Sequence, residues 1–283
     1  MRNTKLAGTL LVLTLLAASG SATAASVITV AYEASKNDAI IKNTNIMTFA
    51  GAKLRVDYLG SESKRSKTTP FLLTTDNGKS WVLGNQDEGT YYCASMATNE
   101  FFNVIGNLIT KIDSYTSPEY SNTRVEQTLE EAGPKIFDHP TVHVRIQSST
   151  KVKAAFLFKT FEFEINKVDD FWYARDMQMH PARQHWIEAL THSGYAHFDN
   201  LSQQIRGSIK GALLRQETVM LVTDLKKKKT DRFGRKINIT SVKEVKDSEL
   251  AADIFTKPAC RDISKDQVKD VAKGMFKEGK LTL

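Results

Sequence analysis

The sequence predicts an α+β fold that is mainly one antiparallel β-sheet interrupted by a few helices. The clearest evidence is residues 68–93, where three short apolar strands are separated by Asp76-Asn77-Gly78 and by a polar stretch that ends at Gly89. Asn-Gly and Glu-Gly pairs supply the positive φ angles that tight hairpin turns require. Several other segments alternate apolar and polar side chains, which is the pattern of strands with one buried face.

The N-terminal part continues this alternation. The strands expected here are residues 27–32, 39–49 and 54–59. In the last of them, Leu54, Val56 and Tyr58 share one face because successive side chains of a strand point to opposite sides. That face should be buried against the rest of the sheet.

Apolar residues at spacings of three and four predict the helices. The segments with this spacing are residues 99–112, 181–193, 199–208 and 264–276. Residues 99–112 are the most apolar of them. We expect this helix to pack on the sheet as part of the core, with a lid over a cavity as the sharper alternative.

The second half returns to strands. Those expected are residues 125–129, 142–146, 154–165, 171–173, 213–225 and 236–245. Residues 154–165 are predicted to be one long strand in which the inward phase changes near Lys159, either through a bulge or because both faces are covered. Asp169-Asp170 is predicted to be a turn. Residues 226–235 are predicted to be a loop, whose four lysines are either a solvated turn or a contact for an anionic headgroup or acidic partner.

Residues 1–25 are expected to be a signal peptide. Arg2 and Lys5 precede an apolar run that is short for a membrane span, and Ala22-Thr23-Ala24 offers a small-x-small cleavage pattern. The expected mature chain, residues 26–283, is then a single domain of a soluble periplasmic protein with no transmembrane segment. The net charge of the whole chain is only +7, which argues against a nucleic-acid partner.

Two cysteines, Cys93 and Cys260, lie in the exported part. A disulfide is the expected state of such a pair in an oxidising compartment. Neither cysteine belongs to a Cys-x-x-Cys motif or has an adjacent histidine, so a reactive or metal-binding thiol is not indicated.

All six histidines lie between His139 and His197. A metal site needs three or four convergent ligands, and His143 on a strand could meet His185 or His192 on a helix. However, the spacings within this cluster match no recognised ligand motif. We therefore expect no metal, and no cofactor is indicated because the phosphate-binding loop motifs are absent. No nucleophile motif and no distinct acid–base pair is present, which predicts a protein that is not an enzyme.

Aromatic residues are concentrated on the expected strands. In a strongly curved sheet their shared face would be a large apolar concavity, which is either filled as core or open as a ligand pocket. The candidate lining residues are Trp81, Phe101, Phe102, Ile105, Phe156, Phe158 and Phe161.

Three short segments resemble the periplasmic lipoprotein-carrier-like superfamily of exported bacterial proteins. They are residues 53–57 (KLRVD), 76–82 (DNGKSWV) and 250–258 (LAADIFTKP). The resemblance implies an open half-barrel of antiparallel strands wrapped around helices, whose inner face holds the acyl chains of lipoproteins in the carriers. The motif positions are structural, so the resemblance implies no functional residue here.

The leading hypothesis from the sequence is therefore a non-enzymatic periplasmic protein that binds a lipid, a lipidated partner or another apolar ligand. One alternative is a structural or interaction protein of the cell envelope with a filled core. Another is a metal-dependent enzyme that uses the cluster between His139 and His197.

Overall fold

The computed structural model describes residues 25–59, 69–87, 89–103, 106–107, 110, 117–156, 159–177, 180–190, 192 and 196–264. The expected signal peptide lies outside the described residues apart from Ala25, the first residue of the first strand. The helix expected at residues 264–276 also lies outside them, apart from Ser264. That residues 26–283 form a single domain stays a prediction.

Long strands dominate the described part of the chain. They are β1 (Ala25–Lys36), β2 (Ala39–Ala50), β3 (Lys53–Leu59), β4 (Thr69–Thr74), β5 (Ser80–Asp87), β6 (Thr90–Ala97), β7 (Glu119–Ala132), β8 (Thr141–Phe156), β9 (Lys159–Ala174), β10 (Ala212–Asp224), β11 (Lys229–Val245) and β12 (Cys260–Asp262). The helical elements are α2 (Pro181–Leu190), α3 (Ala196–Gly207) and the 3₁₀ turn η1 (Asp247–Glu249). Residues 98–103 are also helical, which confirms the start of the helix predicted at residue 99.

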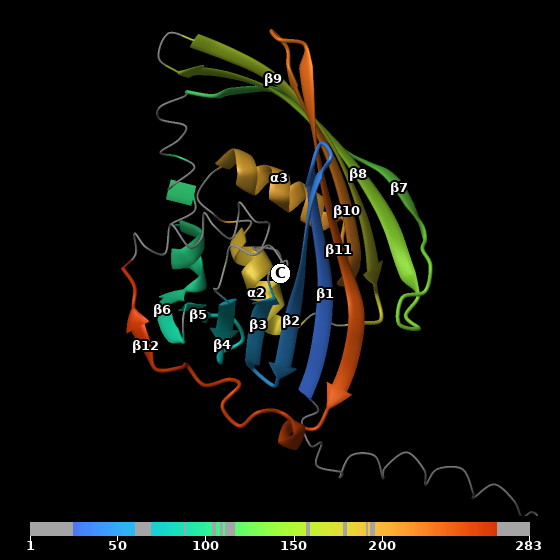
Figure 1. Cartoon of the computed structure of the whole chain (residues 1–283). Coiled ribbons are helices and arrows are strands. Elements are labelled where there is room, and N and C mark those ends of the chain that lie inside the picture. The colour runs from blue at the N-terminus through green and yellow to red at the C-terminus, as the bar shows by residue number, and fades with distance from the viewer. Residues whose placement is uncertain are drawn as a thin grey trace, which may run out of the picture.

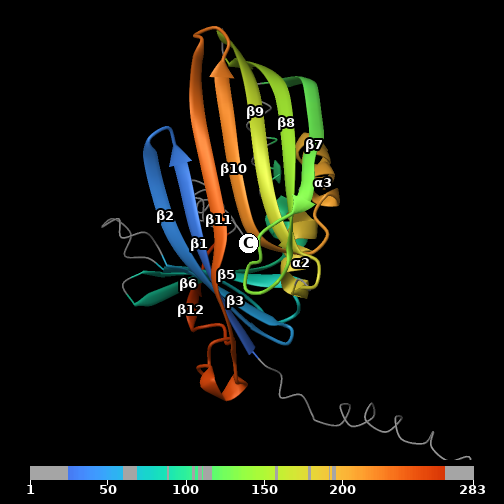
Figure 2. The same ribbon diagram turned by 90° about the vertical axis from the view of Figure 1, so that its right-hand side faces the viewer.

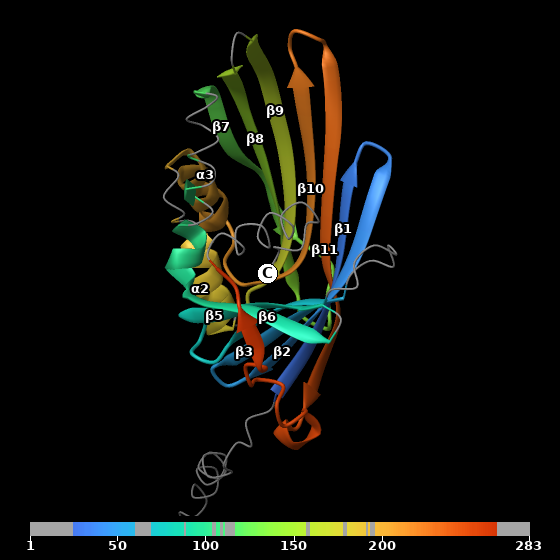
Figure 3. The ribbon, with the colours of Figure 1, turned by 60° about the vertical axis from the view of Figure 1, so that its left-hand side comes forward.

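The described strands form one sheet in the order β12-β6-β5-β4-β3-β2-β1-β11-β10-β9-β8-β7. Neighbours are antiparallel except β12 and β6, which are parallel. The end strands β12 and β7 do not pair with each other, so the sheet is open. It curves strongly, and α2 and α3 lie on its concave side (Figures 1 and 3). The predicted fold class, a mainly antiparallel open half-barrel with a few helices, is confirmed.

We call the concave side of the sheet the inner face and the convex side the outer face. Ile205 and Ile209, near the end of α3, pack against Val144, Phe171 and Tyr173, which places these residues of β8 and β9 on the inner face. Figure 2 shows β7 to β11 side by side, with the ends of β8 to β11 extending well past α3. The far halves of these strands therefore project beyond the two labelled helices.

Three of the sequence predictions for this region are wrong. Residues 154–165 are not one strand, because β8 ends at Phe156 and pairs back with β9 from Lys159. The change of phase, for which we expected either a bulge or coverage of both faces, is due to this hairpin. Asp169-Asp170 is not a turn but lies within β9, and the loop predicted at residues 226–235 is short because β11 already begins at Lys229.

The main core lies where β2 to β6 meet α2 and residues 98–103. Leu54, Val56 and Tyr58 are all buried in it, as their shared strand face predicts. The hairpin turn before β5 has the expected geometry, since Asn77 and Gly78 have φ angles of 59° and 82°. The predicted disulfide between Cys93 and Cys260 is present and joins β6 to β12.

Candidate functional site

The projecting ends of the long strands carry apolar side chains on their inner face. In β9, Phe161, Phe163 and Ile165 share the face of the buried Phe171 and Tyr173, because all five are odd-numbered positions of one strand. The strand register extends this face to β10 and β11, because Val222 of β10 pairs with Ile165 of β9 and Phe233 of β11 pairs with Met220 of β10. All are only half-buried in the structure. We call the following set the inner apolar strip: Phe161, Phe163, Ile165, Met220, Val222 and Phe233.

The outer face of the same strand ends is charged. Glu162 and Glu164 alternate with the phenylalanines of β9, and their cross-strand partners on β8 are Lys153 and Lys151. Opposite charges on facing strand positions are an ordinary solvent-exposed arrangement. The contrast between the two faces therefore holds for the projecting end of β9, whereas the inner face of the β10–β11 hairpin also carries Asp224, Lys229 and Asp231. Figure 3 shows these strand ends beyond α2 and α3.

Below the strip, toward the helices, the inner face becomes polar. Asp169 is 1% exposed, lies 2.6 Å from the Lys167 Nζ, and accepts a 2.7 Å hydrogen bond from the Thr218 hydroxyl. Gln216 donates to the same hydroxyl at 3.1 Å. Arg235 pairs with Thr218 on the next strand. We call these five residues the polar belt.

Arg235 differs from the other charged members of the belt. Its Nε is buried, and its guanidinium makes no hydrogen bond or ion pair within the described part of the chain. Burial raises the pKa of the Tyr32 hydroxyl on β1, and the positive charge of Arg235 opposes this shift. Asn45 Oδ1 and the Tyr58 hydroxyl, farther along the inner face, are also buried without a hydrogen-bond partner among the described residues. Burial raises the pKa of Tyr58 well above its usual range.

A second pair of arginines lies on the two helices. The Arg183 Nε of α2 and the Arg206 Nη1 of α3 are buried, and neither has a hydrogen-bond partner in the described structure. Burial, together with the charge of Arg206, lowers the pKa of Arg183 to about 10. Burial also lowers the pKa of Arg206, against the opposing charge of Glu188. Arg183, Arg206 and Arg235 therefore each have one buried guanidinium nitrogen without a hydrogen-bond partner among the described residues.

The structure separates the predicted lining residues into two groups. Trp81, Phe101 and Phe102 meet in the main core and are at most 1% exposed, and the two phenylalanine rings pack edge to face 5.3 Å apart. Phe161 instead lies in the inner apolar strip and stacks parallel to Phe163 with 6.3 Å between ring centroids. Ile105, Phe158 and the side chain of Phe156 lie outside the described residues.

Sequence reasoning found only the β9 part of the strip. Phe161, Phe163 and Ile165 were seen as one strand face, but Met220, Val222 and Phe233 were not joined to it. Phe233 was assigned to a loop. Counting alternation backward from Ile239 through Ile237 to Phe233 would have extended β11 and placed Arg235 and Phe233 on its inner face.

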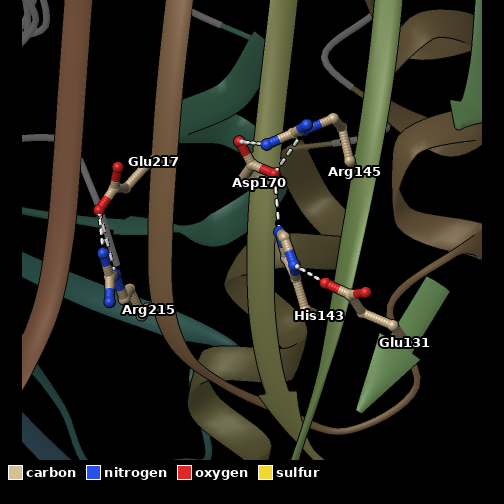
Figure 4. A network of polar contacts seen from close by, with 6 residues as sticks. All are labelled: Glu131, His143, Arg145, Asp170, Arg215 and Glu217. Carbon is tan, nitrogen blue, oxygen red and sulfur yellow. Dashed lines mark hydrogen bonds and ion pairs between the residues drawn. The ribbon is translucent and has the colours of Figure 1, made fainter. Parts of the chain in front are cut away.

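The outer face of β7 to β10 carries a network of polar contacts (Figure 4). His143 lies with Nε2 2.7 Å from an Asp170 oxygen and Nδ1 3.1 Å from a Glu131 oxygen. Arg145 donates to the same Asp170 carboxylate at 2.8 Å, and this hydrogen bond and charge raise the pKa of Arg145. Beside the network, Arg215 pairs with Glu217.

Trp172 connects the two parts of this outer surface. His143 stacks on its ring at 4.4 Å between ring centroids, and the Arg215 guanidinium lies 4.4 Å from the centroid of the same ring. His143 is only 9% exposed, because the carboxylates and Trp172 cover it.

Among the histidines whose side chains the structure describes, those considered as metal ligands do not converge. His143 faces carboxylates on the outer face, whereas His185 Nδ1 lies 2.6 Å from the Asn77 carbonyl and His192 Nδ1 lies 2.9 Å from the Glu188 carbonyl. Among the described residues, no group of three or more His, Cys, Asp or Glu side chains is placed to hold a metal ion. The prediction that His143 could meet His185 or His192 is therefore wrong.

Three of the four lysines of the β10–β11 turn have polar or acidic partners close by. Lys226 donates to the Thr160 carbonyl at 2.9 Å, Lys227 lies 3.3 Å from an Asp224 oxygen, and Lys229 lies 3.7 Å from an Asp231 oxygen. Hydrogen bonds from the Lys227 and Lys226 backbones help to lower the pKa of Asp224. This turn consequently offers a weaker basic surface than its sequence suggests.

In the described part of the chain, no helix has both the length and the apolar character needed to span a membrane. No protein-family model matches the sequence, and no curated protein matches it. Among solved structures, the chain is similar to a domain from Vibrio parahaemolyticus whose description assigns it to outer membrane lipoprotein sorting. The identity is 8%, the match covers 87% of this chain and 91% of that one, and the TM-score is 0.28. A likeness this weak establishes neither a family nor a function.

Proposed function

We propose that this chain is a non-enzymatic periplasmic protein that binds a lipid, or the lipid part of a lipidated partner, on the inner face of its half-barrel. The observation that carries the proposal is the inner apolar strip. Phe161, Phe163 and Ile165 of β9 share the inner face, while Glu162 and Glu164 of the same strand face outward, opposite Lys153 and Lys151. If both faces of these strand ends met only water, there would be no reason for one face to be apolar and the other charged.

The site proposed here differs from the one expected in the sequence analysis. Trp81, Phe101 and Phe102 fill the main core, so they support the ligand site as packed structure and do not contact the ligand. The proposed binding residues are instead those of the inner apolar strip. Phe161 belongs both to this strip and to the lining predicted from the sequence. The strip lies on strand ends that project beyond α3 in the described part of the chain. An acyl chain would therefore have access along these strands.

Native mass spectrometry of the mature protein, with lipid extraction from the same sample, tests the proposal. Wild-type protein should carry a lipid at defined stoichiometry. The double variant F163S/V222S should lose it while keeping its circular dichroism spectrum and thermal unfolding. Replacing Phe137, an exposed phenylalanine in the β7–β8 connection, by serine is the matched control and should leave the bound lipid unchanged. Wild-type protein that is free of lipid and takes up none from vesicles would contradict the proposal.

A second candidate is a protein that interacts with other envelope proteins through its outer face. The specific observation in its favour is Trp172, held between Arg215 and His143 on that face, since Trp and Arg are the residues most often dominant at protein interfaces. Crosslinking in intact cells separates the two candidates. Partners captured from a photo-crosslinker at position 215 but not at position 163 would favour the outer face.

A further inference from the structure

The polar belt contains one cation that the described chain leaves without a counter-ion. Arg235 lies on the inner face of β11, two residues from Phe233 of the strip and opposite Thr218. Its Nε is buried, and no described residue accepts a hydrogen bond from its guanidinium. A buried guanidinium nitrogen without a partner is unfavourable, because it gives up hydration without gaining a hydrogen bond.

The acidic residues around Arg235 already have other partners. Asp169, on the same rung of the sheet, is held by Lys167 at 2.6 Å and by Thr218 at 2.7 Å. Asp231, four residues along the strand, lies 3.7 Å from Lys229. The positive charge of Arg235 is therefore available to a ligand.

The position of Arg235 relative to the strip defines what kind of ligand fits. The strip starts one rung beyond Arg235 and runs along β9 to Phe161. From Asp169, level with Arg235, to Phe161 the strand advances by about 26 Å at a rise of roughly 3.3 Å per residue. A long apolar surface that ends at an unpaired cation matches a molecule with a long apolar chain and one anionic end.

Two further arginines make the concave side more positive. Arg183 and Arg206 also lack hydrogen-bond partners for buried guanidinium nitrogens in the described structure. The charge of Arg206 acts on Arg183 and helps to lower its pKa, so the two cations repel each other. These two helices therefore add positive charge on the concave side, partly offset by Glu188.

We infer that the ligand of the half-barrel is an anionic amphiphile, whose carboxylate or phosphate head is bound by Arg235 while its chain lies along the inner apolar strip. A guanidinium recognises both heads through paired N–H donors. The inference rests on the proposed function, because it names the class of ligand that the same site takes.

Three probes with the same sixteen-carbon chain test it: palmitate, hexadecyl phosphate and hexadecanol. Each is titrated below its aggregation concentration against wild-type protein and against R235Q, R235K and R232Q. Arg232 is the matched control, because it is an exposed residue of the same strand at the opposite parity. Thermal unfolding of each variant checks that the fold is kept, and R235K keeps the charge if R235Q does not fold.

We expect wild-type protein and R232Q to bind at least one anionic probe about tenfold or more tightly than hexadecanol. The preferred anion distinguishes a carboxylate from a phosphate head. R235Q should lose this preference and keep its affinity for hexadecanol, and R235K should retain part of the preference.

The outcomes distinguish a failure of the anionic-head inference from a failure of the proposed lipid binding. Equal binding of all three probes, unchanged in R235Q, would overturn the anionic head and leave lipid binding intact. If none of the probes binds, the proposed function fails. Inorganic phosphate is titrated as a further control, and a phosphate affinity equal to that of hexadecyl phosphate would reveal an adventitious ion only and overturn the inference.

Discussion

His143 and Asp170 join two neighbouring strands across the outer face, with 2.7 Å between Nε2 and a carboxylate oxygen. The other ring nitrogen of His143 faces Glu131 on a third strand at 3.1 Å. Both nitrogens can donate to these carboxylates only when the ring carries both protons. One side chain thereby links β7, β8 and β9.

Replacing His143 by phenylalanine should keep the stacking on Trp172 and remove both carboxylate contacts. We expect a loss of about 1–3 kcal/mol in the free energy of unfolding, because Asp170 is mostly buried and would keep only Arg145. Urea unfolding measures this. His139→Phe is the control, since the His139–Asp176 pair is exposed and should contribute less than about 1 kcal/mol. Equal effects of the two variants would mean that the His143 network adds nothing beyond a surface contact.

Pairing of charges across strands explains why Asp169-Asp170 was wrongly predicted to be a turn. Two adjacent aspartates are typical of a turn, yet Asp169 and Asp170 lie in the middle of β9. Asp169 is paired inward with Lys167 and Thr218, and Asp170 is paired outward with His143 and Arg145. Thr218, His143 and Arg145 come from other strands, so local sequence cannot show that the charges are compensated.

The alternation of apolar residues was sufficient for the short strands but not for the longest ones. It placed Leu54, Val56 and Tyr58 correctly, because their strand is bounded by clear turn residues. Between Phe156 and Lys159 the chain turns back without any Gly, Pro, Asn or Asp, and the hairpin was therefore missed. The inner apolar strip depends on that hairpin and on the full length of β11, which is why the candidate site emerged only from the register of the sheet.

Gly84 gives a sharp test of packing in the hairpin meander. A Cβ built on this residue would overlap the ring of Phe71, which is 1% exposed and packs with Leu73 and Cys93. Gly84→Ala should therefore lower the free energy of unfolding by about 1–3 kcal/mol through overpacking. Gly207→Ala is the control, because a Cβ there meets open space. A neutral effect of Gly84→Ala would show that the Phe71 ring has room to move aside.

The stability should also depend on pH through His180. Its Nδ1 accepts a 3.1 Å hydrogen bond from the Ala182 amide, and its Nε2 donates to the Gly51 carbonyl at 2.8 Å, so the folded protein holds the neutral ring. Burial lowers its pKa below the ordinary value of 6.5, against the opposing effect of the Gly51 hydrogen bond. The unfolded chain therefore binds a proton first as the pH falls.

The contribution of neutral His180 is complete above pH 6.5 and declines as the pH falls below it. For one proton the slope is at most about 1.4 kcal/mol per pH unit. His180→Phe keeps a ring against Phe49, which the histidine contacts with 4.7 Å between centroids, and removes the titration. The difference in unfolding free energy between wild type and variant should shrink from pH 7 to pH 5. A difference that is constant over this range would contradict the assignment.

The disulfide between Cys93 and Cys260 should stabilise the edge of the sheet more than its centre. It closes a loop of 167 positions, for which the chain-entropy model gives about 5 kcal/mol as an upper value. Besides the disulfide, the described backbone joins β12 to β6 by a three-residue parallel pairing and by the hydrogen bond from the Ile263 amide to the Cys93 carbonyl. Strand pairs this short do not persist alone.

In the double variant C93A/C260A we therefore expect a lower melting temperature together with a local change. Hydrogen exchange should become fast at Ile263 and along β12, while the amides of β1 and β11, which pair along the whole of β1, stay protected at moderate temperature. Reducing agent should reproduce this in wild type and have no effect on the variant. Uniform loss of protection across the sheet would instead show that the disulfide holds the global fold, and that the parallel edge strand is as stable as its neighbours.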